Sequence, residues 1–133
     1  MPVESMLSRI CELHRSACEE LGIDPTVHIR PQHDGSAHLE VHGEELHLVT
    51  TERGSELDRR ITTSQEQFLY WLACEKIFRL AQNFERRHRQ PGTDSRRLRF
   101  ATELKYLEAM NQHWSEWRRA EIDQVLLRHP YAS

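Results

Sequence analysis

Apolar residues recur every three or four positions in the first part of the chain, which is typical of an amphipathic helix. The spacing predicts a helix over residues 3–21, with one apolar stripe formed by Met6, Leu7, Ile10, Leu13, Ala17, Cys18 and Leu21. Gly22 follows directly, and glycine readily takes the left-handed conformation that ends a helix. Asp24 and Pro25 then favour an extended exit, because the residue before proline avoids helical geometry.

The pattern changes to alternation in HLEVHGEELHL, residues 38–48, which predicts a β-hairpin. Gly43-Glu44 suits a two-residue turn with glycine at its first central position. This turn predicts the cross-strand pairs Val41–Leu46 and Leu39–Leu48 on one face, and His42–Glu45 and Glu40–His47 on the other. A shift by one residue would destroy both matches, so the register is well specified.

Turn signals on both sides of the hairpin predict a longer meander. His33-Asp34-Gly35 precedes the hairpin and favours a turn. Arg53-Gly54-Ser55 follows it and leads into a weaker strand, in which Leu57 and Ile61 point to the same side. We therefore expect three or four antiparallel strands with one polar face.

Helical spacing returns after TTSQEQ, residues 62–67. Thr63 with Glu66, or Ser64 with Gln67, can form a capping box at the start of this helix. The helix reaches about residue 88 and is apolar around more than one face, so we expect it to pack against neighbours on several sides.

Two further breaks divide the C-terminal part of the chain. Pro91-Gly92 ends the long helix, and Asp94 is a good N-cap for a third helix. A junction at residues 111–114 leads into a last helix that Pro130 ends. Together the elements predict one α+β domain over residues 1–133, with an N-terminal helix, an antiparallel meander of three to four strands and three C-terminal helices packed on one face of the sheet.

Composition limits the classes of function. The 133 residues carry a formal net charge of −3 and have a pI of about 6.3. A dedicated nucleic-acid-binding domain usually has a pI above about 9, so this class is disfavoured unless one basic stretch acts alone. The three cysteines, Cys11, Cys18 and Cys74, lack the spacing of a disulfide framework or a zinc ribbon. We expect them to be reduced packing residues.

The sequence gives no sign of export or of membrane insertion. It has no basic, apolar and cleavable N-terminal signal. No apolar run approaches the roughly 18 residues that a membrane span needs. We therefore expect a cytoplasmic protein without a membrane partner.

The stretch FERRHRQPGTDSRRLRF, residues 84–100, holds six arginines opposed only by Glu85 and Asp94. The first three lie at the end of one helix, where the helix dipole favours cations, and the last three lie near the start of the next, where it disfavours them. We predict a structural clamp at this helix corner, in which Glu85 and Asp94 hold Arg97. An acidic patch on a protein partner and a phosphate group remain open as other ligands of the run Arg86–Arg99.

Nine histidines raise the question of a metal site, and His38, His42 and His47 share the polar face of the hairpin. Zinc needs three or four ligands at about 2.0–2.3 Å. His42 and His47 are diagonal neighbours at about 7–8 Å, so the spacing presets no site. We expect solvated cross-strand contacts of these histidines with Glu40 and Glu45, and no metal.

Motifs of catalysis are missing from the sequence. It has no HExxH, no GxSxG and no glycine-rich phosphate loop. Cys74 lies in mid-helix among apolar residues, where burial makes a thiol unreactive. We predict no enzymatic activity and no cofactor. Trp114 and Trp117 lie three residues apart on one helical face and suit core packing, with an exposed anchor for a partner as the alternative.

Several short stretches follow one another over about residues 36–130: ERG at residues 52–54, LDRRITT, LYW in the long helix, FERRHR at its end, DSRRLRF, HW and AEIDQVLLRHP. In these stretches the sequence resembles the immunity protein 63 family of bacterial polymorphic toxin systems. The resemblance implies a small cytoplasmic protein, encoded beside a toxin, that binds the toxin's catalytic domain and blocks it by occlusion. The N-terminal helix lies outside the resemblance.

Such a protein needs a surface for the toxin, and acidic residues gather in the meander. A toxin that acts on nucleic acid or nucleotides often has a basic cleft, which an acidic inhibitor reaches faster. We hypothesise that the polar face and the Arg53-Gly54 turn meet the toxin through Glu40, Glu45, Glu52, Arg53, Glu56 and Asp58. An ordinary solvated strand face is the alternative. The free protein is expected to be a monomer or a weak homodimer.

Two other functions remain as alternatives. A regulatory nucleic-acid-binding protein would use the arginines of Arg86–Arg99, although the run lacks the interleaved aromatic residues that stack on bases. A small metal-dependent enzyme would use the histidines of the hairpin. Because the chain is acidic overall and has no catalytic motif, we expect a protein partner and no nucleic acid.

Overall fold

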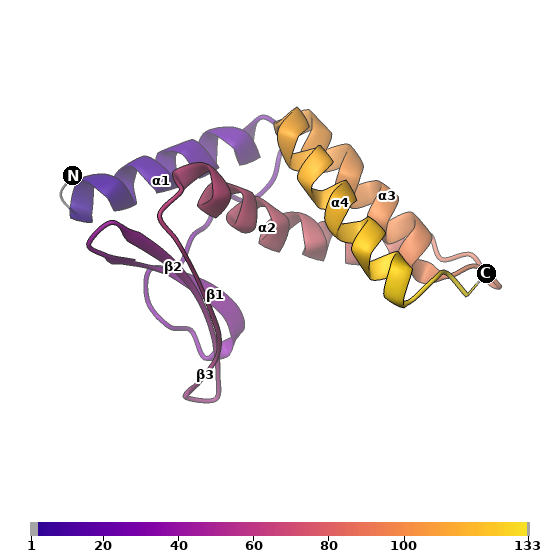
Figure 1. The fold of residues 1–133 in the computed structure, drawn as a ribbon, viewed down its shortest axis with the longest axis horizontal. Helices are drawn as coiled ribbons and strands as arrows, with labels where there is room; N and C mark the ends of the chain where they lie inside the picture. The colour runs from indigo at the N-terminus through magenta and orange to yellow at the C-terminus, as the bar shows by residue number, and fades with distance from the viewer. Residues whose placement is uncertain (1–2, 133) are drawn as a thin grey trace. The chain divides into compact units, whose positions relative to one another are not determined.

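The computed structural model describes residues 3–132, with side chains described from Met6 onward. The elements are α1 (Val3–Glu19), β1 (Asp34–His42), β2 (Glu45–Glu52), β3 (Ser55–Thr62), α2 (Gln65–Arg87), α3 (Ser95–Met110) and α4 (Gln112–Arg128) (Figure 1). The strands form an antiparallel sheet in the order β1-β2-β3. The predicted α+β class, with an N-terminal helix, a meander and three C-terminal helices, is confirmed.

The chain divides into two compact units, one up to Leu72 and one from Ala73 onward. The first unit holds α1, the sheet and the first turns of α2, and the second holds the rest of α2 with α3 and α4. The boundary therefore falls inside a helix. A single domain over residues 1–133, with all three C-terminal helices on one face of the sheet, stays a prediction.

Helix α1 ends as its sequence predicts. Gly22 has a φ of 68°, and its N–H donates to the carbonyl of Glu19 at 3.1 Å. The N–H of Ile23 donates to the carbonyl of Cys18 at 2.9 Å. These two bonds form a Schellman motif, which satisfies carbonyls that the helix end would otherwise leave unpaired.

The β1–β2 hairpin has the predicted register. The Cα partners include Val41–Leu46, Leu39–Leu48, His42–Glu45 and Glu40–His47. Of the two turn residues only Gly43 has a positive φ, at 62°, which fits a turn with glycine at its first central position. Side-chain alternation and this turn thus determined the pairing from the sequence alone.

Strand β3 differs from its prediction because of a β-bulge. Asp58 pairs with Thr50, but the next pair is Glu56 with Thr51, so Leu57 is an extra residue on β3. Leu57 and Ile61 are 59% and 48% exposed, and neither belongs to the buried core of the described residues. The bulge interrupts the regular alternation at Leu57, so the expectation that Leu57 and Ile61 point to one side stays a prediction.

The apolar face of the sheet packs against two helices within the first unit. The core cluster joins Met6 and Ile10 of α1, Leu39 of β1, Leu46 and Leu48 of β2, and Phe68 and Leu72 of α2. Burying one such side chain stabilises the fold by about 1.5–3 kcal/mol. The apolar stripe of the N-terminal helix therefore covers the sheet together with the start of α2.

In the second unit, α3 and α4 run side by side and share one capping residue (Figure 1). Asn111 ends α3, and its side chain accepts a bond from the N–H of His113 at the start of α4. The predicted cap Asp94 starts α3 by accepting from the N–H of Arg96. Within residues 3–132, no helix has the length and apolar character that crossing a membrane requires.

Candidate functional site on the polar face of the sheet

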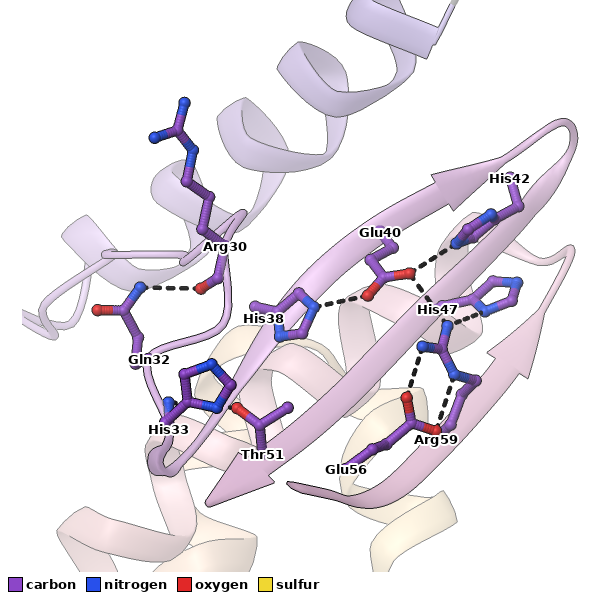
Figure 2. A network of polar contacts seen from close by, with 10 residues as sticks. All are labelled: Arg30, Gln32, His33, His38, Glu40, His42, His47, Thr51, Glu56 and Arg59. Atoms are coloured by element: carbon purple, nitrogen blue, oxygen red, sulfur yellow. Dashed lines mark hydrogen bonds and ion pairs between the residues drawn. The ribbon is translucent and has the colours of Figure 1, made fainter. Parts of the chain in front are cut away.

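The polar face of the sheet carries a connected set of charged and imidazole side chains (Figure 2). Side chains alternate between the two faces of a strand, so the register decides which residues meet. Glu40 lies opposite His47, and His47 and Val49 lie opposite Ile61 and Arg59 of β3. These residues therefore share one face, which we call the network face.

Glu40 is the centre of this network. Its Oε1 accepts bonds from His42 Nε2 at 2.6 Å and from Arg59 Nη1 at 3.1 Å, and its Oε2 accepts from His38 Nε2 at 2.7 Å. The hydrogen bonds from His42, His38 and Arg59 lower the pKa of Glu40 to about 2, against the opposing effect of burial. The carboxylate is therefore charged throughout the neutral pH range.

Arg59 connects all three strands. Its Nε and Nη2 donate to the two carboxylate oxygens of Glu56 at 3.1 and 2.7 Å, and Nη1 reaches both Glu40 and His47. Glu56 first and Glu40 second raise the pKa of Arg59 above its ordinary value. No local pattern in the sequence singled out Arg59, because its partners lie on three different strands.

The contact with Arg59 also fixes the tautomer of His47. Arg59 Nη1 can only donate, so His47 Nδ1, at 2.8 Å, accepts the bond. His47 Nε2 then carries the proton and donates to Glu45 Oε1 at 3.1 Å. His47 is therefore the neutral imidazole in this arrangement, with the lone pair of Nδ1 directed into the network.

One end of the network face is covered by the segment that precedes β1. His28 forms an isolated bridge with His38, and the N–H of Leu39 donates to the carbonyl of His28 at 2.8 Å. The N–H of His33 donates to Oγ1 of Thr51 at 3.3 Å (Figure 2). Thr51 and His38 are 5% and 2% exposed, so this end of the face is closed to solvent.

The expected solvated cross-strand contacts of the histidines are therefore wrong in two respects. His38 and His47 are buried, at 2% and 7% exposure. The bonds of His38 and His42 to Glu40, and of His47 to Glu45, run along a strand rather than across the sheet. The segment before β1 gave no sequence signal that it would cover this face.

The six predicted partner-binding residues do not form one patch. Glu40, Glu45 and Glu56 lie on the network face, whereas Glu52 and Asp58 have the alternation of Leu48 and Thr50 and lie on the opposite face. Asp58 is within 3.8 Å of Arg60, whose guanidinium lies 5.0 Å from the ring of Trp71 on that same side. Arg53 lies in the β2–β3 turn with a φ of 51°.

Three potential metal ligands come together on the network face. One ligand atom each from Glu40, His42 and His47 lies within 4.8 Å of the other two. The rings of His42 and His47 have centroids 4.2 Å apart, because both side chains turn toward each other across the strands. The backbone spacing used in the sequence-based expectation did not include this turn of the side chains.

In the basic run, Glu85 and Asp94 each hold an arginine close to them in the sequence. The carboxylate of Glu85 takes both its bonds from Arg89, at 2.7 and 3.0 Å. Asp94 binds Arg96, whose guanidinium also donates to the carbonyls of His129 and Pro130.

Arg97 and Arg99 contact aromatic rings. The guanidinium of Arg97 lies 4.1 Å from the ring of Tyr131, and that of Arg99 lies 5.4 Å from the ring of Phe78. Arg97 lines one hollow together with Glu85 and Asp94. A clamp formed by Glu85, Asp94 and Arg97 stays a prediction, and much of the second half of the run contacts the chain itself.

Comparison with known proteins gives one match. The family model described as immunity protein 63 matches residues 42–124, which is more than half of the chain. The match includes β2, β3, α2 and α3, and it leaves out α1 and nearly all of β1. No curated protein and no solved structure matches the chain.

Proposed function

Because the chain belongs to the immunity protein 63 family, we propose that it neutralises a cognate bacterial toxin by binding the toxin's catalytic domain and occluding its active site. The family match carries this proposal. The proposed activity needs a binding surface and assigns no catalytic step to the chain. We further propose that the protein acts in the bacterial cytoplasm, as part of a polymorphic toxin system.

We assign the toxin contact to the exposed part of the network face. The side chains of Glu45 and Glu56 are 52% and 47% exposed, and Ile61 on the same face is 48% exposed. Leu57, on the bulge of β3, is 59% exposed. Apolar side chains beside charged ones are typical of a protein–protein interface, whose apolar centre is surrounded by a polar rim.

The charges of this face also support a protein partner with a basic surface. Arg59 pairs with both Glu56 and Glu40, so its single positive charge leaves this face with an excess of negative charge, and Glu45 and Glu56 are its most exposed carboxylates. Together with the net charge of −3, these carboxylates favour association with a basic cleft. A stable complex of this kind buries about 1,200–2,000 Å² in total.

The test compares two pairs of charge reversals. Glu45→Lys with Glu56→Lys changes the network face, and Glu52→Lys with Asp58→Lys changes the opposite face by the same charge. Each pair removes one contact to an arginine of β3, Glu56 with Arg59 or Asp58 with Arg60. We expect the first pair to raise the Kd for the toxin domain at least about ten-fold, because it places like charges against a basic cleft.

The measurements are the Kd for the purified toxin domain and the survival of cells that express the toxin. Circular dichroism melts of both double variants establish that each is folded. An equal loss of binding for the two pairs would contradict the assignment to the network face. If the wild-type chain neither binds the toxin encoded beside it nor protects cells from it, the proposed function is wrong.

A further inference from the structure

Glu40, His42 and His47 present a carboxylate and two imidazoles to one point on the network face (Figure 2). We infer that these three residues bind a transition-metal dication, with Zn²⁺ as the best fit. Their ligand atoms lie within 4.8 Å of one another. Ligands of a tetrahedral zinc ion are about 3.4 Å apart, for bond lengths of about 2.1 Å. Small side-chain rotations bring the three atoms to that distance.

A positive charge already occupies this point. Arg59 Nη1 lies 3.1 Å from Glu40 Oε1 and 2.8 Å from His47 Nδ1, and His42 Nε2 is 2.6 Å from the same oxygen of Glu40. Glu40 and His47 thus already accept bonds from a cation supplied by the chain, whereas His42 Nε2 donates to Glu40 and binds a metal only after its proton moves to Nδ1. A metal ion at the same place takes the lone pairs that now accept bonds from Arg59.

The donor set selects the kind of metal. Two imidazoles and one carboxylate suit Zn²⁺ and its neighbours among the first-row transition metals, whereas Mg²⁺ and Ca²⁺ prefer oxygen ligands alone. Three ligands from the chain leave a fourth position for water or for a side chain of a partner. The two histidines come from the two strands of the hairpin, so the turn at Gly43 holds them together.

The surroundings orient the ligands and leave a path for the ion. His38, 2% exposed, holds Oε2 of Glu40, which directs Oε1 toward the other two ligands. The Nδ1 atom of His38 is buried without a partner, so the bond from Nε2 to Glu40 is the one ring hydrogen bond of His38 that metal binding could affect. The side chain of His42 is 53% exposed, which gives the ion access from solvent.

Arg59 keeps one ion pair, with Glu56, when the metal binds. Its bidentate pair with Glu56, at 2.7 and 3.1 Å, uses Nε and Nη2 and does not involve Nη1. The guanidinium is planar and rigid, so Nη1 moves away only when Arg59 and the half-exposed Glu56 shift together, and this shift breaks only the bonds to Glu40 and His47. Metal binding is an exchange in which Zn²⁺ replaces Nη1 and the guanidinium keeps Glu56.

The test is a calorimetric titration of the complete chain with Zn²⁺ alone at about pH 7, where neutral imidazole is the major form. We expect one ion per chain. His42→Ala and Glu40→Gln should each weaken binding at least about ten-fold. Arg59→Met removes the competing cation and should tighten binding. His113→Ala is the matched control, because His113 is an exposed histidine 3.6 Å from the carboxylate of Glu116.

The outcomes separate the inference from the proposed function, since the titration contains no toxin. His42 is exposed, so its replacement leaves the fold intact even where replacing buried His47 does not. Saturable binding that His42→Ala weakens and His113→Ala does not supports the site. Absence of saturable binding, or equal affinity of His42→Ala and wild type, overturns it. Weaker binding by Arg59→Met overturns the exchange with arginine.

Discussion

Asp94, between α2 and α3, accepts hydrogen bonds from the start of α3 and from the C-terminal segment. It caps α3 through the N–H of Arg96, pairs with the Arg96 guanidinium at 2.9 Å, and accepts a bond from the N–H of Ala132 at 3.0 Å. The Arg96 side chain, followed by the N–H groups of Ala132 and Arg96, holds the pKa of Asp94 well below its ordinary value of 3.8. The cap was predicted from the sequence, but the bond to a residue 38 positions away was not.

The depressed pKa makes the stability of the chain depend on pH. A carboxylate whose pKa is lower in the folded than in the unfolded chain stabilises the fold above its ordinary pKa, and this contribution is lost as the pH falls through the folded pKa. Asp94→Asn keeps a capping side chain and removes the charge. We expect it to lower Tm at about pH 7 by a few degrees, and the difference from wild type to shrink between about pH 4 and pH 2.

The measurement is Tm by circular dichroism across this pH range. Asp123→Asn is the control, because Asp123 is an exposed aspartate of α4. A difference between Asp94→Asn and wild type that stays constant with pH would show that the charge of Asp94 does not act through this pairing.

At the scale of elements, one ion pair joins α3 to α4. Arg118 of α4 donates from Nε to Glu103 of α3 at 3.0 Å, and the two side chains are only 19% and 3% exposed. Arg118 also reaches Glu121 at 3.2 Å and lies 5.6 Å from the ring of Phe100. The pKa of Arg118 is raised by Glu103 and Glu121, although burial acts in the opposite direction.

Removing one partner leaves a buried charge without compensation, whereas removing both does not. We expect Arg118→Ala to lower the free energy of unfolding by about 2–4 kcal/mol. The double variant Glu103→Met, Arg118→Met should recover much of this loss. Urea unfolding followed by circular dichroism measures both. An Arg118→Ala variant as stable as wild type would show that the pair contributes nothing to the packing of α3 on α4.

At the scale of the whole molecule, the chain consists of two compact units, and α2 contributes residues to both. Unfolding of either unit therefore removes packing from a helix that the other unit also uses. We predict that residues 1–133 behave as one cooperative domain. Scanning calorimetry should show one transition whose calorimetric and van't Hoff enthalpies agree. Two separate transitions would show that the units at residues up to Leu72 and from Ala73 unfold independently.

The sequence by itself determined the features that depend on near neighbours. Alternation and Gly43 specified the hairpin register, Gly22 the end of α1, and Asp94 the start of α3. Each of these is set by a few consecutive residues, whose backbone preferences and hydrogen bonds do not require the rest of the fold. Ordered short stretches likewise indicated the family that the match over residues 42–124 shows.

The tertiary structure decided which side chains meet. The bulge at Leu57 placed Glu56 on the network face and Asp58 on the other, and no local pattern in the sequence signalled it. Arg59 bonds to His47 and Glu40, 12 and 19 positions away, and these two contacts exist only once three strands have paired. A register shift of one residue reverses the side chains that follow it, so the residues that β3 adds to each face could not be assigned before its bulge was known.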